Sequence, residues 1–182
     1  MSRAMSGPAR LRLVRLAHQC VVFGIDPGKI SGAAIVVRGE VSSSGVVLEG
    51  EHSSWVEAAV TVAHVEQLPL VAAVETWTSH GRWGFQAALG LGERAGRWLG
   101  ELERQNVYAV VRPQVMEWRR DVFGGGQNVK TEVWDQRAKM HARAATGTTA
   151  VDDNEADAIC IALWGSRADA VAKAMRRAAS SR

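Results

Sequence analysis

The stretch VVFGIDPG, residues 21–28, decides the fold of this chain. Its first five residues are apolar side chains and one glycine, a run that predicts a buried strand, and Pro27 and Gly28 predict the turn that ends it. Asp26 closes the strand. Because an aspartate before Pro-Gly is commonly a turn former, a chemical role for Asp26 depends on which other polar residues the fold brings to the same edge.

Further strands and helices are predicted from hydrophobic periodicity along the rest of the chain. Gly39 and Glu40 predict a hairpin turn, and Ser53 and Ser54 are candidate caps of the first helix. Three antiparallel strands, then strands alternating with helices, predict an α/β fold: a mixed five-stranded sheet flanked by helices, in RNase H-like order. After residue 28, the predicted strands are 32–38, 44–51, 70–76 and 107–112. The predicted helices are 55–68, 85–105, a short helix that ends at 118, 130–145 and a last helix that begins at 154. A glycine loop at 124–126 precedes the helix at 130–145.

Length and composition indicate one globular domain. With 182 residues, 47% of them hydrophobic, the chain can bury a core but is short for two ordinary domains. We divide it into a basic, disordered arm at 1–20, a folded domain at 21–166 and a basic helix end or tail at 167–182. Cys20 and Cys160 have neither zinc-site spacing nor the pattern of a disulfide framework, which favours a reducing cytoplasm. An organelle matrix or a phage-infected cell is also compatible, and no apolar run is long enough to span a membrane.

The net charge of +3 is unevenly distributed. Residues 1–20 and residues 167–182 each carry +4, which leaves −5 on the segment between them. Basic ends on an acidic body suit phosphate contact by flexible arms. Charged ends that only keep the domain soluble are the alternative, and an organelle transit peptide is an alternative for the arginine-rich start.

Acidic residues end two predicted strands and open the last helix. Asp26 ends the first strand and Glu75 the fourth, and these acids become neighbours if the two strands are adjacent in the sheet. Asp153 and Asp157 are four residues apart and therefore share one helix face. Carboxylates this close repel one another and persist at neutral pH chiefly when cations neutralise them. Hard oxygen ligands favour Mg²⁺ or Mn²⁺, so we expect a divalent-metal site here.

The chemistry that such a cluster predicts is phosphodiester hydrolysis. Two divalent ions about 3.5 to 4 Å apart activate a water and stabilise the leaving oxygen. Acids at a helix start are usually caps or dipole partners, which is the ordinary interpretation of Asp152, Asp153 and Glu155. Asp157 lies one turn further in, before the apolar residues 158–164, and is the strongest candidate of the four.

Three segments resemble the RuvC-type Holliday-junction resolvases of the RNase H-like superfamily. They are FGIDPGKISGAAIV (23–36), AAVETW (72–77) and DDNEADAICIAL (152–163), in the order and spacing of that family. The resemblance extends from residue 21 to about residue 165. It implies an RNase H-like fold, catalytic and metal-binding acids at Asp26, Glu75 and Asp157, and Mg²⁺ or Mn²⁺, with two ions per active site.

The resemblance also implies further site residues. The family commonly has an acid or histidine three residues before the last aspartate, where this chain has Asn154. Asp153 stands four before it, and we favour Asp153 as the fourth ligand, with Asn154 in reserve, because a carboxylate is the better metal ligand. Lys130 matches a family lysine that follows a glycine loop and that could contact the scissile phosphate. A solvated lysine at a helix start is the alternative for Lys130.

The chain has seven tryptophans, and we expect some of them to pack in the core and others to contact nucleic acid. Several lie beside arginines in polar surroundings, a mixture suited to stacking on bases and holding phosphates. The family presents an aromatic residue after its strand-end glutamate, and Trp77 is the nearest equivalent here. The candidate nucleic-acid contacts are Trp77, Arg82, Trp83, Trp118, Arg119, Arg120 and Lys130, whereas Trp98, Trp134 and Trp164 have helical spacing and are expected to pack inside.

Together these features predict a structure-selective DNA endonuclease that cleaves four-way junctions in recombination and repair. Two symmetric cuts require two sites, which predicts a homodimer, with the small-residue helix 85–105 as a candidate interface. Branched DNA is the expected partner, with no membrane. A less selective nuclease on branched DNA or RNA/DNA hybrids and a noncatalytic nucleic-acid-binding module are the alternatives.

Overall fold

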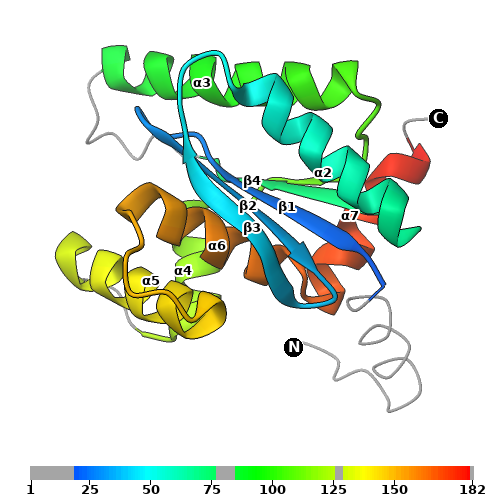
Figure 1. The fold of residues 1–182 in the computed structure, drawn as a ribbon. Coiled ribbons are helices and arrows are strands. Elements are labelled where there is room, and N and C mark those ends of the chain that lie inside the picture. Colours follow the sequence, from blue (N-terminus) through cyan, green and yellow to red (C-terminus); the bar gives the residue numbers. More distant parts are fainter. Residues whose placement is uncertain (1–18, 77–84, 126–128, 181–182) are drawn as a thin grey trace, which may run out of the picture.

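The computed structural model describes residues 19–76, 85–125 and 129–180. In these ranges one mixed sheet has the strand order β3-β2-β1-β4-β5 (Figure 1). Its strands are β1 (Val21–Asp26), β2 (Ser31–Val37), β3 (Glu40–Val47), β4 (Leu70–Val74) and β5 (Val110–Val111). β1 pairs antiparallel with β2 and parallel with β4, which confirms the predicted α/β fold with a mixed five-stranded sheet.

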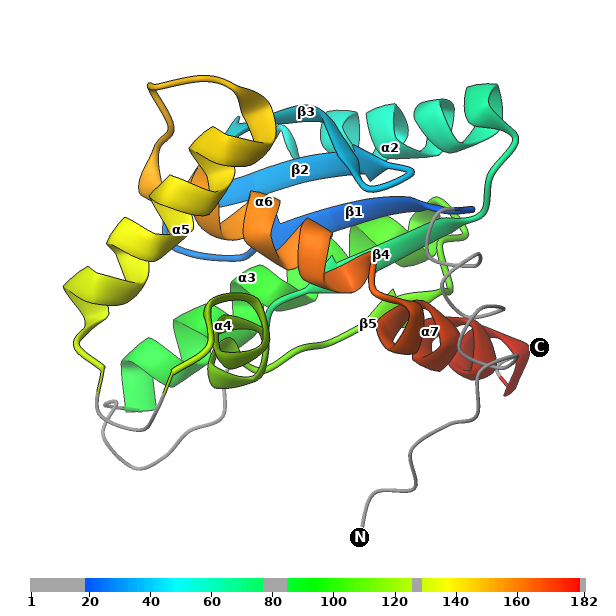
Figure 2. The ribbon, with the colours of Figure 1, turned by 90° about the horizontal axis from the view of Figure 1, so that it is seen from below.

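Helices cover both faces of this sheet. They are α2 (His52–Glu66), α3 (Phe85–Arg104), α4 (Val115–Phe123), α5 (Thr131–Thr146), α6 (Asp153–Gly165) and α7 (Ala168–Ser180). α2 and α3 lie on one face, and α6 crosses the other with α4, α5 and α7 around it (Figures 1 and 2). Among the described residues, no helix combines the length and apolar composition that crossing a bilayer needs.

The alternation of side chains along β1 builds a core on each side. Val22 belongs to the cluster that packs with Ile159 and the rest of α6, and Phe23 belongs to the cluster that packs with Trp98 of α3. Successive strand residues point to opposite faces, so a strand with both faces covered is apolar throughout. Trp98, Trp134 and Trp164 are buried, as the sequence predicts.

Glycines allow α6 to lie directly on the sheet. A Cβ atom added to Gly24 would stand 2.5 Å from the carbonyl oxygen of Ala158, and one added to Gly32 would stand 1.9 Å from that of Asn154. No side chain fits at either place, because real Cβ contacts are longer. The first turn of α6 is therefore held beside the end of β1, where Asp26 pairs with Gly32 across the sheet.

The prediction for the third strand was wrong by four residues. β3 begins at Glu40, because the chain turns at Arg38 and Gly39 and Val37 pairs with Glu40. Both turn residues have positive φ, 52° and 91°, as expected of a tight two-residue hairpin. Arginine rarely adopts this conformation, so the sequence placed the turn one residue too late and the strand at 44–51.

Other boundaries also differ from the sequence prediction. α2 begins at His52, which places Ser53 and Ser54 inside the helix, and its N-cap residue Glu51 makes no side-chain cap hydrogen bond. α4 continues past Trp118 to Phe123, and β5 is only two residues long. The last predicted helix is two helices, and α7 places Ala170, Val171 and Ala174 in the core.

Candidate active site

Asp26 and Glu75 lie side by side at the ends of neighbouring strands. Ile25 is in register with Val74 in the parallel pair, and the backbone N–H of Glu75 donates to the carbonyl of Ile25 at 3.0 Å. Asp26 is 8% exposed and Glu75 is 2% exposed. The expectation that the first and fourth strands are adjacent is confirmed, and it places two buried carboxyl groups at one edge of the sheet.

The third acid comes from the start of α6. Asp152 caps this helix by accepting a hydrogen bond from the backbone N–H of Asn154, and Asp157 follows one turn later. Asp157 Oδ2 accepts a 2.7 Å hydrogen bond from Arg119 Nη2. Asp157 Oδ1 is buried and has no hydrogen-bond partner among the described residues. Such an orphaned acceptor is costly unless a cation or donor reaches it.

The electrostatics of the three acids show that they interact. Burial, followed by repulsion from Glu75 and Asp157, raises the pKa of Asp26 well above its usual range. Burial raises the pKa of Glu75 to about 7 and also raises the pKa of Asp157. The positive charge of Arg119 lowers the pKa of all three groups. Arg119 is therefore their shared counter-charge.

Two consecutive residues of α4 reach the cluster, and sequence reasoning missed this. Trp118 Nε1 donates to Glu75 Oε1 at 2.6 Å, while Arg119 pairs with Asp157. Base contact by Trp118 was a wrong expectation, because its side chain is completely buried. Arg119, predicted to contact nucleic acid, has a side chain that is only 12% exposed. A tryptophan and two arginines in a row give no sequence signal for this arrangement.

Charged residues of α5 flank the cluster. Asp135 Oδ1 lies 3.7 Å from Arg119 Nη2, so Arg119 stands between two carboxylates. Asp153 pairs with Lys139 at 2.7 Å and its side chain is 62% exposed. Asn154 donates from its side-chain amide to Asp152. Asp153 nonetheless raises the pKa of Asp157 by its charge, so it belongs to the same electrostatic group.

The other residues that were predicted to contact nucleic acid make no described contact with the acid cluster. Lys130 is exposed at the N-cap position of α5. Arg120 is exposed on α4, where its Nε atom donates to the carbonyl of Met116. Trp77, Arg82 and Trp83 fall outside the described residues.

A divalent metal fits this edge of the sheet. Within the described ranges, no three Asp, Glu, His or Cys side chains stand closely enough around one point to hold an ion as they are placed. The donor set is nevertheless the one that Mg²⁺ and Mn²⁺ prefer. The orphaned Asp157 Oδ1 and the raised pKa values of the buried Asp26 and Glu75 and the partly buried Asp157 both indicate a site that a cation stabilises.

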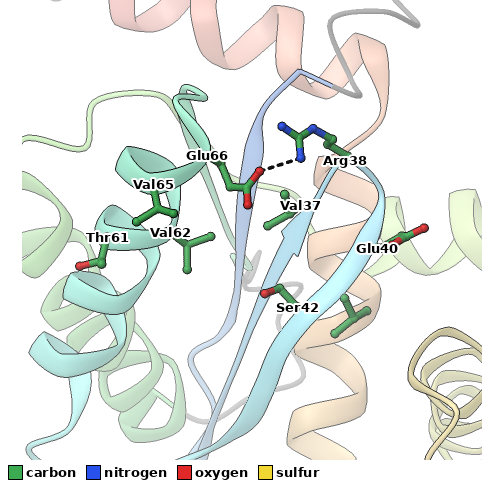
Figure 3. Close-up of a pocket in the computed structure, with 9 residues that line it drawn as sticks. Val37, Arg38, Glu40, Ser42, Thr61, Val62, Val65 and Glu66 are labelled. Atoms are coloured by element: carbon green, nitrogen blue, oxygen red, sulfur yellow. Dashed lines mark hydrogen bonds and ion pairs between the residues drawn. The ribbon is translucent and has the colours of Figure 1, made fainter.

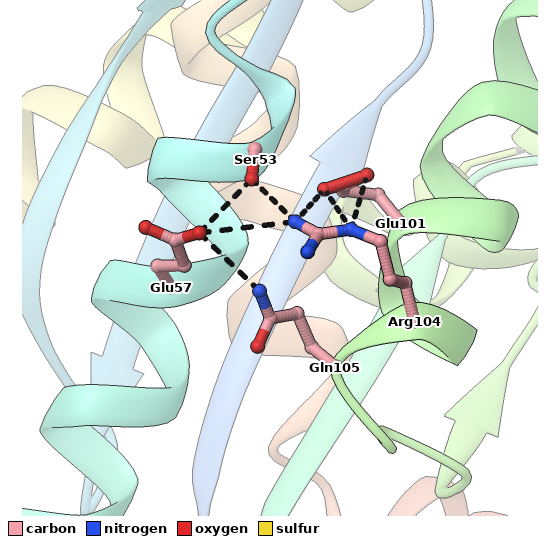
Figure 4. Close-up of polar contacts among 5 residues, drawn as sticks. All are labelled: Ser53, Glu57, Glu101, Arg104 and Gln105. Carbon is pink, nitrogen blue, oxygen red and sulfur yellow. Dashed lines mark hydrogen bonds and ion pairs between the residues drawn. The ribbon is translucent and has the colours of Figure 1, made fainter.

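Two features lie apart from the acids. A cavity of about 430 Å³ separates the β2–β3 hairpin from α2 and is bordered by the Arg38–Glu66 ion pair (Figure 3). A polar cluster joins α2 to the end of α3, with Arg104 contacting Glu101, Ser53 and Glu57 (Figure 4). Arg104 and Glu57 are exposed, and Ser53 and Glu101 are half-buried, which indicates a surface link between the two helices.

Solved structures that are similar to this one include two of RuvC. T. thermophilus RuvC in complex with a Holliday junction substrate has a TM-score of 0.59 and 23% identity, over 84% of this chain and 96% of that one. The chain has the RuvC fold. A Thermus thermophilus RuvC structure matches with a TM-score of 0.58 and 23% identity, over 86% of this chain and 97% of that one. No protein-family model and no curated protein matches the sequence.

The likeness to RuvC confirms the resemblance that three short motifs indicated. At 23% identity it establishes the fold, and it covers nearly the whole length of the RuvC chain. The activity has to be argued from the residues of the site.

Proposed function

We propose that this protein is a structure-selective DNA endonuclease that cleaves four-way junctions by divalent-metal-dependent phosphodiester hydrolysis, in recombination and repair. One observation carries the proposal. Asp26, Glu75 and Asp157 come from β1, the end of β4 and α6, and the two buried acids and the partly buried Asp157 lie close enough to repel one another at one edge of a RuvC-type sheet.

These acids are the proposed metal ligands, with Asp153 as a fourth and Asn154 in reserve. Bound Mg²⁺ or Mn²⁺, two ions per site, supplies the charge that activates water and stabilises the leaving oxygen. The chain itself fixes the ligands: strand pairing sets Asp26 beside Glu75, and the glycine contacts of α6 set Asp157 above them. Burial keeps bulk water from screening their charges, which strengthens electrostatic interactions there.

The proposed DNA contacts are basic and aromatic. Lys130 is exposed at the N-cap of α5 and Arg120 is exposed on α4, and these two helices flank the acid cluster. Arg119 contributes positive charge inside the site, and Trp77 and Arg82 remain candidates from the sequence. Branched DNA is the substrate class that we favour, because one of the structural neighbours was solved with a Holliday junction. Binding through phosphates predicts affinity that falls steeply as salt rises.

We also propose that the protein acts as a homodimer through α3. Gly92, Gly96 and Gly100 have open space where a Cβ would stand, and Leu89, one turn before Gly92, is 47% exposed. These four residues form an open stripe that a second copy can approach closely. Light scattering tests this: the wild type should have the mass of two chains and Leu89→Arg that of one. A wild-type monomer on junction DNA would overturn the dimer.

The decisive experiment compares a labelled four-way junction with a matched duplex, a flap and an RNA/DNA hybrid. Wild type, Asp26→Asn and the matched control Asp169→Asn, an exposed acid of α7, are assayed with Mg²⁺, with Mn²⁺ and with EDTA. We expect paired symmetric nicks in the junction, lost with Asp26→Asn or EDTA and retained with Asp169→Asn. Cleavage mainly of the other substrates would make this a less selective nuclease.

One observation favours a second candidate, a noncatalytic nucleic-acid-binding module. Arg119 already neutralises Asp157 through a 2.7 Å ion pair, which is an arrangement that needs no metal. Junction binding without cleavage in any metal would support this candidate. The raised pKa values of Asp26 and Glu75 argue against it, because one arginine leaves the buried acids undercompensated.

A further inference from the structure

Trp118 makes a contact that is unusual for a core aromatic residue. Its indole Nε1–H donates to Glu75 Oε1 at 2.6 Å, and both side chains are buried. We infer that Trp118 is a positioning residue, which holds the Glu75 carboxylate in the orientation that a divalent cation requires. This inference rests on the proposed function, because it deepens the role of the same site.

The backbone fixes the two partners relative to one another. Thr76, directly after Glu75, donates from its N–H to the carbonyl of Pro113 at 2.8 Å and forms a parallel bridge with Gln114. Gln114 is the N-cap of α4 and takes part in a capping box with Glu117. The end of β4 and the start of α4 are therefore joined one residue beyond Glu75 and four residues before Trp118.

Packing fixes the indole ring as well. Phe123 meets it edge to face, with ring centroids 5.8 Å apart. The guanidinium carbon of Arg119 lies 5.2 Å from the ring centroid, while the same guanidinium pairs with Asp157. The ring cannot turn without disturbing both neighbours. Consecutive residues of α4 thus each hold one acid, Trp118 holding Glu75 and Arg119 holding Asp157.

The chemistry of the donor explains what this contact achieves. An indole N–H is a donor only and does not titrate, so it engages Oε1 whether or not a cation is present. Glu75 would then offer its other oxygen, Oε2, to a cation, and Trp118 would hold the carboxylate in one orientation for it. Groups that orient metal ligands in this way commonly affect metal affinity by about 10- to 100-fold.

The test measures Mn²⁺ binding by isothermal titration calorimetry, independently of cleavage. Trp118→Phe removes the donor and keeps a ring. Trp164→Phe is the matched control, because Trp164 Nε1 donates at 3.0 Å to Asp121, a carboxylate outside the cluster. We expect Trp118→Phe to weaken Mn²⁺ binding about tenfold and Trp164→Phe to leave it unchanged. In a Glu75→Gln background, Trp118→Phe should have no further effect.

A second measurement uses the wild-type protein, so it holds even if Trp118→Phe does not fold. In ¹H–¹⁵N spectra, the indole N–H of Trp118 should shift on titration with Mg²⁺, and that of Trp164 should not. Equal Mn²⁺ affinity in Trp118→Phe and wild type, or an unmoved Trp118 resonance at Mg²⁺ saturation, would overturn the positioning role. Failure of the wild type to bind either metal would overturn the proposed function itself.

Discussion

Arg119 Nη2 lies 2.7 Å from Asp157 Oδ2 and 3.7 Å from Asp135 Oδ1, so one guanidinium stands between carboxylates of α6 and α5. The same charge lowers the pKa of Asp26 and Glu75. Arg119, on a helix that the sequence did not connect to the acids, is thus the shared counter-ion of Asp26, Glu75 and Asp157.

Replacing Arg119 with glutamine should therefore destabilise the protein. Removing one member of a largely buried ion pair costs about 3–5 kcal/mol, because the partner charge is left uncompensated. Urea unfolding without metal measures this free energy. Arg104→Gln is the control, since its ion pairs are on the surface, and it should change the free energy of unfolding far less than Arg119→Gln does. Similar losses in the two variants would contradict the role given to Arg119.

Stability should also fall with rising pH when no metal is present. Burial raises the pKa of Glu75 from 4.5 to about 7 in the folded protein, so the folded state binds a proton that the unfolded state releases earlier. This contribution is fully present below pH 4.5 and is lost as the pH rises to about 7. Thermal melts in EDTA across this window, for wild type and Glu75→Gln, measure it. If the melting temperature of the wild type falls with pH no more steeply than that of Glu75→Gln, the raised pKa does not belong to Glu75.

Gly32→Ala should detach the start of α6 from the sheet. The new Cβ would stand 1.9 Å from the carbonyl oxygen of Asn154, so the helix must move and Asp157 with it. We expect a loss of about 3 kcal/mol or more and weaker Mn²⁺ binding. Gly90→Ala on α3 lies outside the proposed dimer stripe, and the nearest atom to its added Cβ is Arg94 Nη1 at 3.5 Å, an ordinary contact; it should stabilise the protein by about 0.5–1 kcal/mol. Denaturant unfolding measures the free energy of unfolding of both variants. A Gly32→Ala variant as stable as the wild type would contradict the prediction.

Asp26→Asn should be more stable than wild type while losing cleavage. The amide removes a buried charge whose pKa is raised by burial and by two neighbouring acids. We expect a gain of about 1–2 kcal/mol at pH 8 in EDTA, because active-site charges are commonly kept at the expense of stability. Saturating Mg²⁺ should reduce this difference in stability between Asp26→Asn and the wild type, because the ion stabilises the wild type more strongly than the variant. A variant less stable than wild type in EDTA would show that Asp26 has a structural partner.

Much of this architecture could be predicted from the sequence. Apolar runs ending in an acid located β1 and β4, and Asp26 and Glu75 were expected together on the condition that these strands are neighbours, which the sheet meets. The four-residue error at β3 arose from Arg38, whose left-handed backbone conformation no side-chain pattern encodes.

The part that could not be predicted concerns which groups surround the acids. Trp118 and Arg119 lie in a polar, charged segment that has the composition of a surface. Their burial follows from how α4 packs after Thr76 binds Pro113, which is a tertiary relationship with no local signal. For the same reason, the pairing of Asp153 with Lys139 was not foreseen.

The site takes its acids from positions 26, 75 and 157, and α6 delivers the last of them while covering one face of the sheet. During synthesis, β1 and β4 leave the ribosome long before α6 does. A nascent chain therefore holds two of its three acids on a sheet that still lacks its central cover. Such long-range closure is slow compared with local helix formation, so the three acids come together only when α6 completes the core. A product that ends before α6 would lack both Asp157 and the helix that covers the sheet.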